Sequence, residues 1–403
     1  MGDFYQDGYV TTLHNFRKTP VEELETRLAK FAKRRPMGLI IPALYSELEK
    51  PALAKIVETL KDIPYISEIV IGLDAADKKQ FEHAKEYFSV LPQHHRILWN
   101  HGPRLQELRK MLISKKIHYG DAGKGQNVWF CFGYMIASGK SEAVALHDAD
   151  IITYSRDMVA RLYYPVADPT FNYKFCKGYY FRADDEKLNG RATRLLVTPL
   201  IRTLKKFFPD DEYLEFMDSF RYILSGEFSM RADVMKTVRI PFDWGLEVGI
   251  LSEVQRNNSF NRICQVEIAD SYDHKHQPVS QENPNGGLSK MSFDIARNLF
   301  VKMAINGRIF NKGTFRSIKA TYTRIALDFV ERYTADAVIN GLSIDRDAEE
   351  QTVDLFAQNI YRAGIEFLDY PDLVPYIPSW KRVISAIPEF SDMFYDAVEE
   401  DNA

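Results

Sequence analysis

The first 150 residues alternate between short apolar runs and longer amphipathic segments. Four apolar runs predict buried strands, because few polar residues interrupt them: 37–47, 66–77, 95–100 and 143–150. The segments between them are long enough for helices: 50–61, 78–89 and 125–138. A further helix is predicted over 19–35, where Thr19 is a candidate cap, Pro20 suits the first helical position and Glu22 suits a capping box. This alternation predicts an α/β fold, a wound and mostly parallel sheet with helices on both faces.

The pattern changes after residue 160. The segment 171–182 and the segment that starts at Arg262 are typical of strands, whereas 191–208 is predicted as a loop that leads into a helix. Proline and paired glycines make 280–290 a break, and the periodicity is largely helical from Met291 to about residue 398. We therefore expect three parts: an N-terminal helical extension (1–36), a main domain (37–290, with halves of about 37–155 and 156–290) and a helical C-terminal extension (291–403).

Acidic residues follow the predicted strands. Glu47 comes after the first strand, Asp74 ends the second, and Asp148 and Asp150 end the fourth. In such sheets ligands bind at the carboxyl ends of the strands, and two carboxylates two residues apart share one face of an extended backbone. Because like charges repel, this pair indicates a divalent cation such as magnesium. Two capping aspartates or a phosphatase-type nucleophile are the alternatives, and an EF-hand loop is excluded because Thr153 stands at its glycine position.

Two loops could complete such a site. The stretch GDAGKGQN (120–127) places glycines around Lys124, so a phosphate could approach the backbone and meet the ammonium group. It is not a Walker loop, because GxxxxGK[ST] is absent. His274 and His276 lie two residues apart in a polar loop and either bind a metal or face solvent.

Composition narrows the class of protein. The chain is 45% hydrophobic and 27% charged, as in ordinary globular proteins, and no apolar run approaches the ~20 residues of a membrane span. The N-terminus has no signal-like segment, so we expect a cytoplasmic protein without membrane association. The net charge of −4 argues against nucleic acid as a partner. The three widely spaced cysteines support neither disulfides nor a cysteine zinc site.

Seven short motifs follow one another between residues 37 and 290: IPALYSE (41–47), GKGQN (123–127), HDADI (147–151), NGRATRLLVTPL (189–200), LSGEFSM (224–230), WGLEVGILSEV (244–254) and HKHQP (274–278). This ordered series resembles the glucosyl-3-phosphoglycerate synthases and their mannosyl relatives, retaining glycosyltransferases of family 81 with the GT-A fold. Tyr45 and Ser46 depart from the family's P-A-L-N-E-E motif. The resemblance fades over the N-terminal 36 residues and most of the C-terminal helices.

The resemblance implies a role for each matching position. For the metal, Mg²⁺ or else Mn²⁺ or Co²⁺, it implies Asp150, Asp148 and His274 as ligands. For the nucleotide sugar, UDP- or GDP-glucose, it implies Leu44, Glu47, Asp74, Lys124 and Asp148. For the acceptor, 3-phospho-D-glycerate, it implies Gly190, Arg191, Ala192 and Thr193. As catalytic residues it implies Glu247, Glu227 and Asp150, and it also implies a homodimer.

The implied activity is transfer of glucose to the 2-hydroxyl of 3-phosphoglycerate with retention of configuration. Retention normally calls for a carboxylate nucleophile, and no residue in the sequence is clearly that nucleophile. We therefore expect front-face attack assisted by the leaving phosphate, with Glu247 positioning the sugar. The alternatives are mannosyl-3-phosphoglycerate synthesis, synthesis of mannosylglycerate or glucosylglycerate from free glycerate, a sugar nucleotidyltransferase, and a non-enzymatic binding or scaffold protein. The stretch ALYSELEK lacks the glycine-rich loop that a nucleotidyltransferase needs after its first strand.

Overall fold

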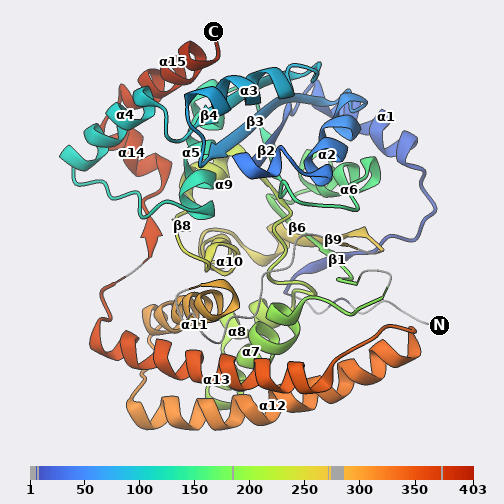
Figure 1. Ribbon diagram of the computed structural model, residues 1–403, viewed down its shortest axis with the longest axis vertical. Helices are drawn as coiled ribbons and strands as arrows, with labels where there is room; N and C mark the ends of the chain where they lie inside the picture. The colour runs from blue at the N-terminus through green and yellow to red at the C-terminus, as the bar shows by residue number, and fades with distance from the viewer. Residues whose placement is uncertain (1–5, 7–8, 184–185, 271, 274–285, 374) are drawn as a thin grey trace.

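A computed structural model describes residues 6, 9–183, 186–270, 272–273, 286–373 and 375–403 (Figure 1). Its centre is an eight-stranded sheet with the order β1-β9-β6-β7-β5-β2-β3-β4. The strands are β1 (Thr11–Leu13), β2 (Met37–Leu44), β3 (Ile66–Asp74), β4 (His94–Trp99), β5 (Ala143–Leu146), β6 (Phe175–Tyr180), β7 (Phe228–Arg231) and β9 (Ile263–Ala269). All neighbours pair in parallel except β7, which is antiparallel to β5 and to β6. The predicted α/β class and mostly parallel sheet are confirmed.

Helices cover both faces of this sheet. One face carries α1 (Val21–Ala32), α2 (Pro51–Lys61), α3 (Lys78–Phe88) and α6 (Arg156–Ala167). The other face carries α4 (Pro103–Ser114) and α5 (Lys124–Ser138). Side chains of one strand alternate between the two cores: Leu39 and Ile41 join the first, and Ile40 joins the second. Such strands are apolar on both sides, which is why they appear as continuous apolar runs in the sequence.

The second half of the chain adds shorter elements around the sheet. They are the π-helix η2 (Ala192–Val197), α7 (Thr198–Phe207), α8 (Glu212–Asp218), α9 (Ala232–Thr237), α10 (Leu246–Asn257) and the 3₁₀ turn η3 (Phe260–Arg262). In the first half, the 3₁₀ turn η1 (Tyr45–Glu47) follows β2. The predicted loop over the start of 191–208 is therefore wrong, since these residues form the π-helix that continues into α7. None of the helices within the described ranges is both long and apolar enough to cross a membrane.

Both predicted extensions also contribute strands. The N-terminal segment supplies β1, which pairs with β9, so residues before 37 are not helical throughout. Helix α1 confirms the predicted helix, but it begins at Val21 after Pro20 at the cap position, so the predicted threonine cap is wrong. In the C-terminal part, β10 (Tyr376–Ile377) pairs with β8 (Ile240–Pro241).

The C-terminal helices lie at two ends of the molecule. They are α11 (Gly287–Ile305), α12 (Lys312–Ile339), α13 (Arg346–Asp369), α14 (Trp380–Ala386) and α15 (Phe390–Asn402). In Figure 1, α12 and α13 cross the end of the molecule that carries α7, whereas α15 lies near α4 at the opposite end. Helix α15 covers the edge strand β4, where the Asn402 amide bonds both the N–H and the carbonyl of Ile97, at 2.9 Å each. This contact satisfies backbone groups that an edge strand leaves open.

Candidate active site

Four of the predicted site segments meet at the carboxyl edge of the sheet. Glu47 lies in η1 directly after β2, and Asp148 and Asp150 follow β5. Because β7 runs antiparallel, Glu227 comes to the same edge from the residue before that strand. Lys124 is the first residue of α5. The topology thus brings together residues that are far apart along the chain.

Lys124 is the central cation of this group. Its ammonium nitrogen lies 2.7 Å from one oxygen of Asp148 and 3.2 Å from Glu247, which is in the first turn of α10. Burial alone lowers the pKa of Lys124, but the Asp148 and Glu247 carboxylates outweigh burial and raise that pKa above its ordinary value. The lysine is therefore charged at neutral pH.

The Asp148 and Asp150 carboxylates interact electrostatically. Burial, followed by the Asp148 charge, raises the pKa of Asp150 to about 7, and Glu47 and Glu227 act in the same direction. Gly226 leaves room for the Asp148 carboxylate, since a Cβ on Gly226 would lie 2.4 Å from an Asp148 oxygen. The two aspartates therefore influence each other's ionisation, and their role as a metal-binding pair stays a prediction.

Glu227 is completely buried and held by three hydroxyl groups. Tyr272 donates to one carboxylate oxygen at 2.7 Å, and Tyr180 and Ser225 donate to the other at 2.8 and 3.1 Å. Burial and the Asp148 charge nevertheless raise the pKa of Glu227. A carboxylate with three donors is fixed in place.

Lys177 is a member of the group that the sequence reading did not select. It is fully buried in β6, and its ammonium donates to the carbonyl of Ser225 at 2.6 Å. Burial lowers the pKa of Lys177 to about 8, against the opposing charges of Glu247 and Glu227. A lysine inside the apolar run FCKGYY was the signal in the sequence, because lysine is rarely buried without a charged neighbour.

The predicted acceptor segment forms the start of the π-helix. Gly190 has a φ of +79°, which glycine adopts without strain, and Arg191 and Ala192 follow it into η2. Thr193 is 5% exposed, and its hydroxyl makes no hydrogen bond to any residue that the structure describes. Arg191 donates from Nε to Glu349 of α13 at 2.9 Å. A buried hydroxyl without a partner and a half-buried arginine are suited to an anionic ligand.

Aromatic residues connect this segment to Glu227. A Cβ on Gly190 would lie 3.3 Å from Arg182 and 3.4 Å from the Tyr222 hydroxyl. The ring of Tyr222 lies 4.9 Å from that of Tyr180, which donates to Glu227. Tyr222 and Tyr180 therefore form a continuous contact between the predicted acceptor segment and Glu227.

Two predicted donor-binding residues lie at the neighbouring strands. Leu44 is 47% exposed at the end of β2 and is paired in register with Asp74 of β3. Asp74 faces His101, with 3.9 Å between Asp74 Oδ1 and His101 Nδ1, and burial raises the pKa of Asp74 despite that histidine. Asp74 thus belongs to a separate polar group beside the Lys124 group.

The carboxylates of the site suit a divalent cation. The pKa of Asp150 is raised by burial first and by the neighbouring Asp148 charge second, and a hard cation with oxygen ligands would stabilise the ionised form. The predicted third ligand, His274, lies outside the described residues. Within the described part of the chain, no group of three or more His, Cys, Asp and Glu side chains has the arrangement of a metal site. Asp148 and Asp150 therefore supply part of a ligand set.

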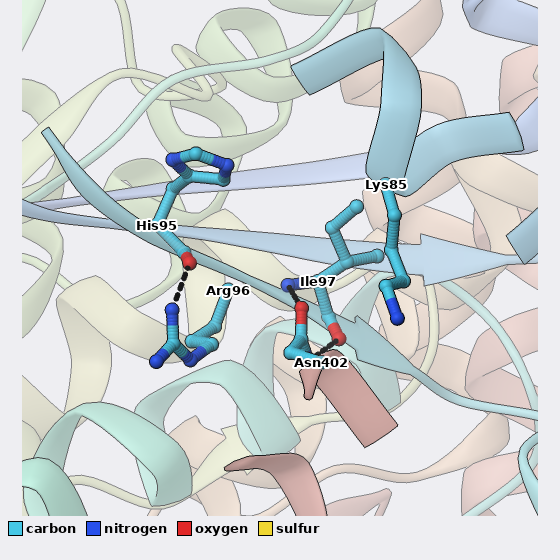
Figure 2. A pocket seen from close by; sticks show the side chains of 5 residues that line it. All are labelled: Lys85, His95, Arg96, Ile97 and Asn402. Atoms are coloured by element: carbon cyan, nitrogen blue, oxygen red, sulfur yellow. Dashed lines mark hydrogen bonds between the residues drawn. The ribbon is translucent and has the colours of Figure 1, made fainter. Parts of the chain in front are cut away.

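A small cavity lies elsewhere, where α15 and α3 meet β4. Figure 2 shows its lining residues, Lys85, His95, Arg96, Ile97 and Asn402. Its volume of about 120 Å³ is below the roughly 300–1,000 Å³ of typical small-molecule sites. The candidate functional site is therefore the carboxyl edge of the sheet and not this cavity.

Two comparisons with known proteins find relatives and structures of one enzyme family, and a third finds none. No family model matches the chain. The chain is 45% identical over 403 residues to the glucosyl-3-phosphoglycerate synthase of Persephonella marina, covering 100% of both chains. It is 41% identical over 400 residues to the enzyme of the same name from Methanococcoides burtonii, covering 98% of this chain and 97% of the relative.

Solved structures of similar fold include two transferases. One is glucosyl-3-phosphoglycerate synthase from Mycobacterium tuberculosis in complex with Mn²⁺, UDP and glucosyl-3-phosphoglycerate, with a TM-score of 0.54, 18% identity, and coverage of 73% of this chain and 88% of that one. The other is mannosyl-3-phosphoglycerate synthase from Rubrobacter xylanophilus, with a TM-score of 0.55, 19% identity, and coverage of 75% and 83%. At these identities the likeness shows the fold.

Proposed function

The chain belongs to the glucosyl-3-phosphoglycerate synthase family, and on this premise we propose that it transfers glucose from UDP-glucose to the 2-hydroxyl of 3-phosphoglycerate. The protein is a glycosyltransferase, which excludes the alternatives of a sugar nucleotidyltransferase and a non-enzymatic scaffold. The observation that carries the proposal is the full-length similarity to two relatives of that name, at 45% and 41% identity. The carboxylate group and the arginine-bearing π-helix at one sheet edge are consistent with a phosphorylated acceptor and a metal-bound donor.

The donor end of the site is the Lys124 group. A divalent cation held by Asp148, Asp150 and, we propose, His274 would supply electrostatic stabilisation of the charge that grows on the leaving diphosphate. Mn²⁺ and Mg²⁺ each occur with UDP in structures of the M. tuberculosis enzyme, which supports either ion. The charged ammonium of Lys124 would contact the same diphosphate.

The nucleoside would lie along the neighbouring strand ends. We propose that Leu44, Glu47 and Asp74 contact it, because Leu44 is exposed beside Asp74 and Glu47 faces the aspartate pair. Uridine is proposed as the base because the M. tuberculosis enzyme is described with UDP-glucose.

Glu227 and Glu247 would position the hexose rather than attack it. Glu227 is bound by three hydroxyl groups, and Glu247 is paired with Lys124. We therefore propose front-face attack: the 2-hydroxyl oxygen bonds to the anomeric carbon, the bond from that carbon to the phosphate oxygen breaks, and the hydroxyl proton passes to the leaving diphosphate. A covalent glycosyl adduct trapped on any carboxylate of the enzyme would contradict this mechanism.

The acceptor end is the start of the π-helix. Gly190 and Ala192 would contribute backbone contacts, and Arg191 would bind an anionic group of 3-phosphoglycerate by two parallel hydrogen bonds. The Thr193 hydroxyl, which no described residue engages, would donate to the same acceptor.

The test is a transfer assay on the purified protein. It is incubated with 3-phosphoglycerate and, separately, with UDP-glucose, GDP-glucose, UDP-mannose and GDP-mannose, with Mg²⁺, Mn²⁺ or EDTA, and the products are identified by mass spectrometry. We expect glucosyl-3-phosphoglycerate from UDP-glucose, with no product in EDTA. Absence of transfer to 3-phosphoglycerate from every donor would refute the proposal, and a preference for GDP-glucose would refute only the choice of base. We also propose a homodimer, and light scattering at the monomer mass would exclude it.

A further inference from the structure

The helical hairpin formed by α12 and α13 contacts the acceptor segment and the residues just before it. The Tyr322 hydroxyl of α12 donates to the carbonyl of Leu195 inside the π-helix. At the turn between the two helices, Ser343 donates from its backbone nitrogen and its hydroxyl to the carbonyl of Glu186, at 2.7 and 2.9 Å. π-Helical turns are rare, and they occur frequently at functional sites. The hairpin thus supports the part of the chain that carries Arg191.

Glu349 of α13 is the charged contact in this support. It is 1% exposed, and its carboxylate binds two arginines at once. One oxygen accepts from Arg191 Nε at 2.9 Å and from Arg194 Nη2 at 3.2 Å, and the other accepts from Arg194 Nη1 at 2.8 Å. Two cations and one anion leave a net positive charge, which is suited to an anionic ligand.

The two arginines bind Glu349 through different numbers of nitrogens. Arg194 is buried, its Nε donates to the carbonyl of Asn189 at 2.8 Å, and its guanidinium lies 4.9 Å from the centre of the Tyr333 ring, so all of its nitrogens have partners. Arg191 gives only Nε to Glu349, and its side chain is 35% exposed. Its two terminal nitrogens make no hydrogen bond to any residue in the described ranges. Glu349 therefore fixes Arg191 through Nε, while the two terminal nitrogens of Arg191 can still donate to a ligand.

We propose that Glu349 is a positioning residue for the acceptor: it holds Arg191 by Nε so that the two terminal nitrogens bind an anionic group of the acceptor as a pair. This inference rests on the proposed function. The C-terminal hairpin is then part of the acceptor site, although Glu349 itself does not touch the substrate. An arginine fixed before binding loses less conformational freedom when the ligand arrives, so Glu349 acts on acceptor affinity.

The first test is Glu349→Gln, which keeps the shape of the side chain and removes its charge. We expect the KM for 3-phosphoglycerate to rise about 5- to 20-fold, while kcat and the KM for the nucleotide sugar stay within about twofold of wild type. Glu350→Gln is the matched control, because Glu350 is the exposed neighbour that pairs with Arg346, and its KM values should not change. A general loss of structure would lower kcat and affect both substrates.

A double variant separates positioning from a structural role. If Glu349 acts through Arg191, adding Glu349→Gln to Arg191→Ala should not raise the acceptor KM beyond that of Arg191→Ala alone. A further rise would overturn the proposal. If Glu349→Gln does not fold, Glu349→Asp carries the test, because the variant keeps the negative charge between the two arginines while the shorter side chain lengthens the contact with Arg191. An unchanged acceptor KM in that variant would also overturn it.

The outcomes for the two proposals are distinct. If the wild-type enzyme does not glucosylate 3-phosphoglycerate, the proposed function fails. If the wild-type enzyme does so and Glu349→Gln has the same acceptor KM, only the role of Glu349 fails.

Discussion

Replacement of Lys124 tests whether one half-buried cation holds the carboxylates of the site together. In Lys124→Met the side chain keeps similar length but loses its charge. Asp148, at 2.7 Å, and Glu247, at 3.2 Å, then face each other without the ammonium between them. Since burial already raises the pKa of Asp150 and Glu227 nearby, the site has little capacity for further uncompensated charge.

The size of the effect follows from the exposure of the pair. Removing one partner of a fully buried ion pair costs about 3–5 kcal/mol, whereas exposed pairs contribute about 0–1 kcal/mol. The Lys124 side chain is 35% exposed, so solvent screens part of its charge. We therefore expect a loss of about 2–3 kcal/mol, which for a chain of 403 residues corresponds to a melting temperature lower by about 2–4 °C. The pKa of Lys124 is raised in the folded state, so its contribution is fully present at neutral pH and is lost only at strongly alkaline pH.

The assay is thermal unfolding at about pH 7.5 in EDTA, with Lys110→Met as the control. Lys110 pairs with Glu107 on an exposed helix face, where each side chain is 72% exposed. Lys110→Met should therefore have the same melting temperature as the wild type. Addition of Mg²⁺ should narrow the gap for Lys124→Met, because a divalent cation neutralises the same carboxylates. The turnover of this variant should fall about 100-fold. A melting temperature of Lys124→Met in EDTA within about 1 °C of wild type would refute the electrostatic argument.

Three further changes probe other parts of the fold. Burial, together with the charge of Asp294, raises the pKa of Asp243 from 3.8 to about 7. The wild type should therefore lose up to about 4 kcal/mol of stability relative to Asp243→Asn as the pH rises from about 4 to 7. If the melting temperatures of the two proteins changed in parallel across that pH range, the prediction would be wrong. In Gly133→Ala the new Cβ would lie 2.0 Å from the buried Trp380 ring, so stability should fall by about 1–3 kcal/mol, measured by urea unfolding. Tyr272→Phe removes a 2.7 Å hydrogen bond that lowers the pKa of Glu227. Because that pKa rises in the variant, the acidic limb of the pH profile of kcat should move to higher pH. An unchanged pH profile would show that ionisation of Glu227 does not limit turnover.

The sheet edge could be predicted from sequence because it depends on strong local patterns. Strands β2, β3 and β5 are buried on both faces, so each is a continuous apolar run, and each is followed by acidic residues. Parallel strands bring their carboxyl ends to one edge, so Glu47, Asp74 and the aspartate pair could be placed there without knowledge of the strand order.

Other features depend on tertiary contacts that leave little trace in the sequence. β1 is only three residues long and gains its place from pairing with β9. The π-helix starts after a positive-φ glycine and is supported by Tyr322, which lies 127 residues further along the chain than Leu195. No local periodicity predicts either contact, because propensity describes neighbours in sequence and not in space. Glu349 was unrecognised for the same reason.

The distribution of charge along the site indicates how the two substrates would be oriented in the proposed function. At one end, carboxylates crowd together and favour a metal-bound diphosphate; at the other, Arg191 and Arg194 share a single carboxylate and favour an anionic acceptor. Glu227 and the tyrosines that donate to it connect these ends, since the ring of Tyr180 also contacts that of Tyr222 beside Gly190. A substrate pair bound in the reverse order would set a phosphate against the aspartates and a cation against the arginines. Electrostatic repulsion at both ends therefore selects the order in which the hexose lies between donor and acceptor.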